Sequence, residues 1–517
     1  MELWLVTWSA AIAFAMAWAI GAQDVSNALG TSVGSKAITV RQAIYIAGIF
    51  EFAGSLAGGE VAGMISGGIL SVKTFMDRGD EGVTLYAEVM FSTMFGAFLW
   101  LAFATYFSLP VSTTHSLVGA LIGVGFVALG PSSVNYSSLT AIITSWVTSP
   151  LLGGAFAYVI FSTLHATILL QPNPRQAAIE NVPYFMGFTF GTLTAFIARV
   201  GPKAVRLSVS TSLILFVVSS VAISVMIKSI GLTKCSLFYN RIVLAFRGLT
   251  SGPVVEDASV SKEANNSGDS DSEVLLSKPD KDGARSRSKT TSQGAAGATD
   301  DAGGADVETG VAESSSGDDS EKDSREDGGN KSDLAIAESM FINLMVVTAC
   351  VVSFAHGSND VSNSVGPFTA IMEIWLTGQI STNSAPPVWI LVLGGVGIVV
   401  GLGTYGHKVM ATVGENIAKL TYTRGFTAQI STALTVLMAT QLGLSVSTTH
   451  CLIGAITGVA LVEGSEKINK ATIKKIIISW LVTLPAAAMF GILIFVSFGF
   501  TAAKPVDGTL SSMTPEQ

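Results

Sequence analysis

The chain has 517 residues, of which 49% are hydrophobic and only 13% are charged, and its mean hydropathy is +0.55. Because a soluble domain carries about 25% charged residues, this composition excludes an ordinary soluble protein. Repeated apolar runs near the roughly 20 residues that cross a bilayer predict an all-α polytopic membrane protein. The net charge of −8 says little about partners, because much of the acidity lies in one central segment. We predict no nucleic-acid partner.

Apolar runs divide the chain into two membrane halves. Seven runs come first, at residues 3–20, 43–70, 86–107, 117–129, 139–164, 184–200 and 207–227. Five more follow at residues 334–354, 388–405, 426–444, 452–462 and 476–500. The sequence therefore predicts about 12 transmembrane segments, in which the short runs at 117–129 and 452–462 are half-helices or parts of re-entrant pairs.

The predicted domain organisation follows from these runs. The N-terminal membrane half covers residues 1–231, a hydrophilic loop 232–333, the C-terminal membrane half 334–503, and a short tail 504–517. The loop is rich in Ser, Gly, Asp and Glu, so it cannot bury enough apolar surface to fold, and we expect it to be disordered. Its many Ser and Thr residues suggest kinases as partners, with a passive tether as the alternative.

Two motifs occur twice, in the same order. Residues 21–31 read GAQDVSNALGT and close an apolar run, and residues 357–366 read GSNDVSNSVG after another. A charged side chain at membrane depth costs at least about 2.5 kcal/mol, so each Asp marks a functional site by default. The string LPVSTTH at 109–115 returns as LSVSTTH at 444–450. Asp360 follows Asp24 by 336 positions and Thr448 follows Thr113 by 335, which indicates an internal duplication.

The duplication predicts an inverted repeat. Because seven spans precede the second copy, that copy is turned over in the membrane, and the shared site is expected near the midplane on broken helices. Basic residues gather in the loops after the first, seventh, ninth and eleventh runs, all on one side, while Arg199, Lys203 and Arg206 lie on the other. The side of the membrane with most of these basic residues should be cytoplasmic. Both termini are then outside and the central loop is cytoplasmic.

These duplicated strings resemble the inorganic phosphate transporter (PiT) family, whose signature is similar to GANDVANA in two copies, with a PVSTTH string in each half. The resemblance covers both membrane halves and omits the central loop. It implies a secondary active transporter that imports inorganic phosphate with sodium, or with protons, by alternating access. It further implies an integral membrane protein with no resident cofactor. We expect a plasma-membrane location and a homodimer.

The Ser-Thr-Thr residues of the two LxVSTTH strings, called the hydroxyl strings below, are the candidate phosphate ligands. They are Ser112, Thr113, Thr114, Ser447, Thr448 and Thr449. Three hydroxyls beside the free backbone N–H groups of a helix start form a donor-rich nest for an oxyanion. The alternative is structural: the two serines cap helices, and the threonines bond back to preceding carbonyls.

The acidic motifs are the candidate cation site. Asp24, Asn27, Asp360 and Asn363 offer hard oxygen ligands, with each Asn one helical turn after its Asp. Unwound backbone at Gly21 and Gly357 would add carbonyl oxygens, as in the discontinuous helices of transporters. The family resemblance implies roles in sodium and phosphate binding for the same four residues. The alternative is a structural, hydrogen-bonded carboxylate.

Several positions depart from or extend the family pattern. Gln23 replaces a usual Asn, which Asn359 retains, and Gln429 stands where the eukaryotic pattern has Glu. Glu51 lies within the second run and matches a family Glu, so we interpret it as a functional carboxylate. His115 and His450, which end the strings, are interpreted as structural groups, with proton coupling as the alternative.

Rival functions remain open at this point. A proton-coupled phosphate permease or a sulfate permease would use the same fold. From other classes, an intramembrane hydrolase would use Ser112 with His115 or Asp24, and a phosphate sensor would bind without transporting. Neither a phosphate-binding GxxxxGK[ST] string nor a convincing catalytic triad is present in the sequence, so we predict that the chain is not an enzyme.

Overall fold

The structure is a computed structural model that describes residues 2–231, 332–406, 420–464 and 470–500, apart from short gaps at 60–61, 64, 66–67, 108, 110, 201–205, 382–384 and 443–445. Within these residues the regular structure is helical, with an isolated antiparallel bridge between Leu70 and Val134. The predicted loop at 232–333, apart from its last two residues, and the predicted tail at 504–517 lie outside the described residues.

The first half contains the helices α1 (Leu3–Gln23), α2 (Val25–Gly34), α3 (Val40–Ala57), α5 (Val72–Met76), α6 (Gly79–Tyr106), α7 (Thr113–Leu129), α8 (Tyr136–Leu164), α9 (Pro174–Val200) and α10 (Val209–Ile230). The second half contains α13 (Ile342–Thr377), α14 (Val388–Gly401), α16 (Tyr422–Gln441), α17 (Thr448–Glu463) and α18 (Lys470–Ser497). Each predicted apolar run overlaps one of these helices. Seven helices of the described chain are long and apolar enough to cross a membrane, and α7 and α17 are shorter apolar helices. The predicted all-α membrane fold is confirmed.

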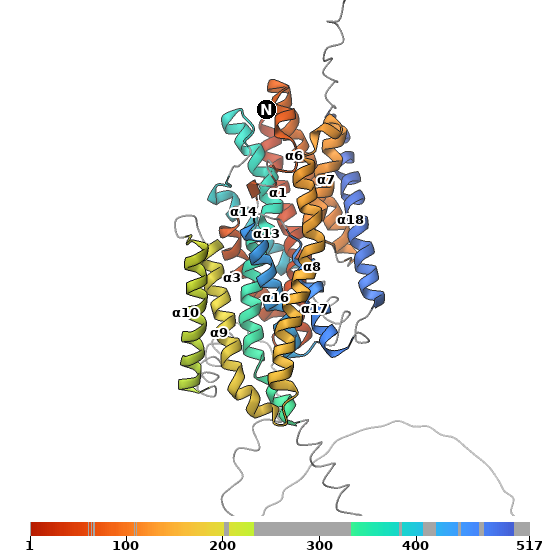
Figure 1. Ribbon diagram of the computed structural model, residues 1–517. Coiled ribbons are helices and arrows are strands. Elements are labelled where there is room, and N and C mark those ends of the chain that lie inside the picture. The colour runs from red at the N-terminus through yellow and green to blue at the C-terminus, as the bar shows by residue number, and fades with distance from the viewer. Residues whose placement is uncertain are drawn as a thin grey trace, which may run out of the picture. The chain divides into compact units, whose positions relative to one another are not determined.

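Helices of the first half pack mainly on helices of the second half. Helix α3 of the first half packs on α13, whereas α14 of the second half packs on α1; in the same way α7 packs on α18 and α8 on α17. Figure 1 shows α18 beside α7 at one edge of the bundle and the α9–α10 pair at the other. Since each interface joins one helix from each half, the two halves bury their motifs against each other.

The predicted unwinding at Gly21 and Gly357 is wrong. Gly21 lies inside α1 and Gly357 inside α13. A Cβ added at Gly21 would lie 1.9 Å from the carbonyl oxygen of Ile398, and one at Gly357 would lie 2.3 Å from that of Glu51. These glycines therefore allow close helix packing.

The helix break falls at a different place. Helix α1 ends at Gln23 and α2 begins at Val25, so Asp24 occupies the junction in the first half. In the second half, by contrast, the helix α13 is 36 residues long and continues through Asp360 without a break. Only one copy of the acidic motif therefore interrupts its helix.

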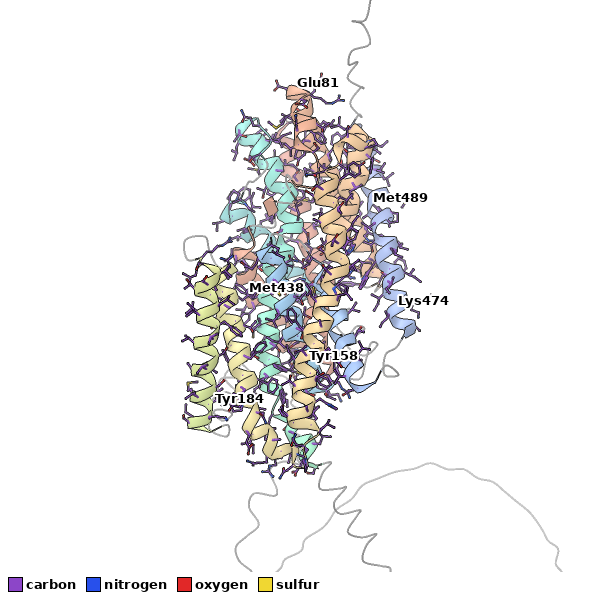
Figure 2. The ribbon with its side chains drawn as sticks, in the orientation of Figure 1. Glu81, Tyr158, Tyr184, Met438, Lys474 and Met489 are labelled. Atoms are coloured by element: carbon purple, nitrogen blue, oxygen red, sulfur yellow. The ribbon has the colours of Figure 1, made fainter. Side chains whose placement is uncertain are left out.

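The outer faces of the bundle are apolar. Leu151 on α8 is 66% exposed and Met489 on α18 is 61% exposed. Figure 2 shows Met489 on the outer side of α18, with Lys474 nearer one end of the same helix. Exposed apolar side chains of this kind would be costly in water but suit contact with lipid tails.

Candidate functional site

The hydroxyl strings begin the two short helices. Ser112 is the N-cap of α7 and accepts a hydrogen bond from the His115 backbone N–H, and Ser447 caps α17 by accepting one from His450. The structural alternative is therefore seen for both serines, whose hydroxyl hydrogens are still able to donate. All three hydroxyl residues of each string are buried.

The threonines reach the acidic motifs. Thr449 donates to Asp24 Oδ1 at 3.3 Å, and Thr448 donates to Asp360 Oδ2 at 3.3 Å. The side-chain amide of Asn363 donates to the hydroxyls of both Thr113 and Thr114, each at 3.3 Å. The first string therefore contacts the acidic motif of the other half, and the second string contacts the acidic motifs of both halves.

The two carboxylates come together with a histidine. Ligand atoms of Asp24, His356 and Asp360 all lie within 4.8 Å of one another, and all three residues are buried. Two like charges at this separation repel by about 3.5 kcal/mol at an effective dielectric constant of 20. A cation bound between them would replace this repulsion with attraction, so the arrangement suits a cation.

Three buried acceptor oxygens near these carboxylates have no hydrogen-bond partner among the described residues. They are Asn359 Oδ1, Asn363 Oδ1 and Glu51 Oε1. Buried polar atoms are nearly always paired, so each unpaired one calls for an explanation. Because a hard cation takes oxygen ligands and an amide oxygen cannot donate, a bound cation would satisfy them.

Sequence reasoning missed His356. Its Nδ1 lies 2.8 Å from Glu51 Oε2, and its Nε2 lies 2.8 Å from Asp360 Oδ2, where the angle is out of line for a hydrogen bond. The histidine therefore joins α3 to the acidic motif of α13. The available signal was a His four residues before an Asp inside an apolar run, one helical turn away on the same face.

This histidine breaks the symmetry of the repeat. Gly21 packs on Ile398 where Gly357 packs on Glu51, so Ile398 and Glu51 occupy equivalent positions. By the offset of the acidic motifs, Ile20 is the counterpart of His356. All four side chains are fully buried. A polar His–Glu pair at the α3–α13 interface thus replaces an apolar Ile–Ile pair at the α1–α14 interface.

The two motif amides hold the segments that lead into the strings. Gln23 Nε2 donates to the Leu109 carbonyl, and Asn359 Nδ2 donates to the Val446 carbonyl at 2.8 Å. The longer Gln23 also accepts a hydrogen bond from Thr105 through Oε1 at 3.0 Å. The amide oxygen of Gln23 therefore accepts a hydrogen bond from a protein side chain, whereas that of Asn359 accepts none among the described residues.

Gln429 belongs to a second polar cluster. Its Nε2 donates to Thr31 Oγ1 at 2.9 Å and to Ser32 Oγ at 2.6 Å, and its Oε1 accepts from Thr348 at 2.7 Å. This cluster joins α16 to α2 and α13. Asn27 lies in α2, but its side chain is outside the described part of the structure, so its predicted role stays a prediction.

The fold is that of a polytopic membrane protein, in which duplicated helices bring hydroxyl and amide donors together with carboxylate and amide acceptors between the two halves. Residues 20–491 match the sequence profile of the phosphate transporter family, and the chain belongs to that family. It is a transporter and not an enzyme.

Individual proteins to which the chain is similar also have names that refer to phosphate transport. The chain is 37% identical to a putative phosphate permease of Haemophilus influenzae, over 95% of this chain and 96% of that protein. It is 34% identical to the chloroplastic inorganic phosphate transporter 2-1 of Arabidopsis thaliana, over 93% of this chain and 70% of that protein. Among solved structures it is similar to a sodium-dependent phosphate transporter, with a TM-score of 0.70 and 30% identity over 96% of this chain and 99% of that one.

Proposed function

We propose that this chain is a secondary active importer of inorganic phosphate, coupled to sodium and working by alternating access of one site shared by both halves. The observation that carries the proposal is the meeting of both threonine pairs with the acidic motifs. Thr448 and Thr449 contact Asp360 and Asp24, and the other pair contacts Asn363. Phosphate needs hydrogen-bond donors and sodium needs oxygen acceptors, and both kinds of group converge there. The similar sodium-dependent transporter supports sodium as the coupling ion.

The proposed roles divide between donors and acceptors. Phosphate would be bound by the hydroxyls and helix-start N–H groups of Ser112, Thr113, Thr114, Ser447, Thr448 and Thr449. Sodium would be bound by Asp24, Asn27, Asp360 and Asn363, with Gln23, Asn359, Glu51 and Gln429 supporting the site. The two strings contain no fixed positive charge, so they would bind the anion weakly enough to release it.

Accumulation of an anion needs more than one cation. Each net positive charge that moves inward gains about 2.3 kcal/mol per 100 mV of membrane potential. Two close carboxylates and three unpaired acceptor oxygens offer ligands for more than one sodium ion. We therefore expect net inward movement of positive charge with each phosphate.

The test is uptake of labelled phosphate by the purified chain in liposomes with an imposed sodium or proton gradient. We expect a sodium gradient to drive uptake, and Asp24→Asn and Asp360→Asn each to reduce it at least about 100-fold, a barrier change of nearly 3 kcal/mol. Asp80→Asn, an exposed acid in the first turn of α6, is the matched control. Uptake driven by protons alone would favour a proton-coupled permease. Binding without uptake would indicate a sensor.

The anion is tested separately. Hydrogen phosphate still carries an O–H donor, whereas sulfate at neutral pH does not, so an acceptor-only Asp would favour phosphate. We expect unlabelled sulfate to compete at least about 10-fold less well than unlabelled phosphate, which is a difference of about 1.4 kcal/mol. Equal competition would contradict a selective role for Asp24 and Asp360.

The membrane location, the orientation and the partners of the chain are also proposals. We propose a plasma-membrane location. We also propose that both termini are outside and the central loop is in the cytoplasm, an orientation supported by the distribution of basic residues. A homodimer, and kinases acting on the loop, stay predictions. Deleting residues 267–324 without effect on uptake, surface level or regulation would support a passive tether.

A further inference from the structure

A stack of four rings crosses between the two halves just behind the hydroxyl strings. The centroid of the Trp146 ring on α8 lies 4.0 Å from that of His115 on α7. His115 lies 4.5 Å from His450 on α17, and His450 lies 3.5 Å from Trp480 on α18. The interplanar angles are 38°, 36° and 30°, so the rings meet through tilted faces.

The stack has the symmetry of the repeat. His450 follows His115 by 335 positions, and Trp480 follows Trp146 by 334, close to the offset of the hydroxyl strings. Read from either end, the order is Trp, His, His, Trp, so the pseudo-two-fold axis passes between the two histidines. Both histidines are 2% exposed. Their contact is therefore a buried point where the two halves meet directly.

Ring faces, more than hydrogen bonds, hold the stack together. Trp146 Nε1, His115 Nδ1, His450 Nε2 and Trp480 Nε1 are buried without a hydrogen-bond partner among the described residues. The polar contact that is seen, from His450 Nδ1 to the Trp146 carbonyl oxygen, is long at 3.4 Å. Offset and tilted ring pairs are attractive beyond the area that they bury, so the spacing of α7 and α17 depends on these rings.

Each histidine is tied to the turn that carries the anion donors. His115 is the third residue of α7, and its backbone N–H donates to the capping Ser112 at 3.3 Å; His450 stands in the same relation to Ser447. A shift of one ring against the other would therefore change the gap between the two threonine pairs. A tetrahedral anion of fixed size needs that gap to be fixed.

We propose that the stack of Trp146, His115, His450 and Trp480 sets the spacing of the two hydroxyl strings, so that His115 and His450 are positioning residues for phosphate. The proposal rests on the proposed function and adds to it two residues that contact each other across the halves. It also requires the histidines to act through their ring faces, which phenylalanine can reproduce.

The test compares alanine and phenylalanine variants in the liposome uptake assay, with rates normalised to folded transporter. His115→Ala and His450→Ala should each raise the phosphate KM about 3- to 10-fold, which is the range for loss of an aromatic pair, with little change in maximal rate. Because either change removes the same central contact, the double variant should raise the KM by less than the product of the two. His115→Phe and His450→Phe should stay within about 2-fold of the unmodified chain.

Trp100→Ala is the matched control. Trp100 on α6 is also buried, also has an unpartnered Nε1, and stacks on Phe103 at 5.8 Å, outside the four-ring stack. We expect this variant to lose folded protein but to keep the phosphate KM, because only packing is lost.

Two results would overturn the proposal. If the alanine variants lose folded protein and maximal rate at an unchanged KM, the rings only pack. If the phenylalanine variants fail as the alanine variants do, a ring nitrogen and not the stack is needed. Calorimetric titration of the same purified variants with inorganic phosphate separates the two proposals: an unmodified chain that binds but does not transport refutes the transport function, while the order of the affinities still tests the stack.

Discussion

Replacing the buried His–Glu pair tests how far the two halves are equivalent. His356→Ile introduces the residue that the first half has at the matching position and leaves Glu51 buried without its partner at 2.8 Å. Removing one member of a buried ion pair costs about 3–5 kcal/mol, because the other is left as an unpaired buried charge. We expect the single variant to lose about this much stability.

The double variant His356→Ile with Glu51→Ile should recover most of that loss. It reproduces the fully buried Ile20 and Ile398 pair of the other interface, and replacing a buried pair by apolar residues is often neutral or stabilising. The assay is thermal or denaturant unfolding of the purified chain in detergent, followed by size-exclusion chromatography. If the double variant is as unstable as the single one, the two interfaces are not equivalent and the reasoning fails.

Two further changes test the packing and the second polar cluster. Gly21→Ala and Gly357→Ala should each destabilise the fold by about 1–3 kcal/mol or more, because the new Cβ would overlap a carbonyl oxygen; Gly403→Ala, with no atom within 4 Å, is the control, and equal stability of all three variants in detergent unfolding would contradict this account. Gln429→Glu should lower the sodium KM of phosphate uptake about 3- to 10-fold, the effect of an ion contact of about 1 kcal/mol, because the new carboxylate would attract the cation. Thr348 and the other hydroxyls around it can all donate to a carboxylate, so the substitution should be tolerated, and an unchanged sodium dependence would contradict this prediction.

The helical fold and the duplication of the motifs could be predicted because both can be read directly from the order of the residues. Apolar runs located the helices, and the offset of Asp24 from Asp360 revealed the duplication. The exchange of partners between α3 and α14 could not be predicted, since it depends on which glycine meets which carbonyl across the bundle. The same limit explains the wrong expectation for Gly357: a glycine that permits close packing has the same letter as one that permits unwinding.

Most of the candidate site residues were named because their motifs are duplicated, and the residue that sequence reasoning missed has no repeated counterpart. The threonines and Asp360 occur in strings that the chain contains twice, so repetition marked them. His356 has isoleucine as its counterpart, so a search for repeated chemistry passes over it. Its contact with Glu51, 305 positions away, needs the α3–α13 interface to exist before it can be seen.

This asymmetry bears on how the site opens to each side. In an inverted repeat, exchanging the conformations of the two halves converts one end state of the transport cycle into the other. Two chemically identical halves would give the two end states equal free energies. The α3–α13 interface contains the polar pair of His356 and Glu51, whereas the α1–α14 interface contains Ile20 and Ile398. A rearrangement of the first interface would therefore break polar contacts, and a rearrangement of the second would break apolar ones. Under the proposed alternating access, this asymmetry would bias the chain toward one of its two end states, beside the carboxylate that we propose as a sodium ligand.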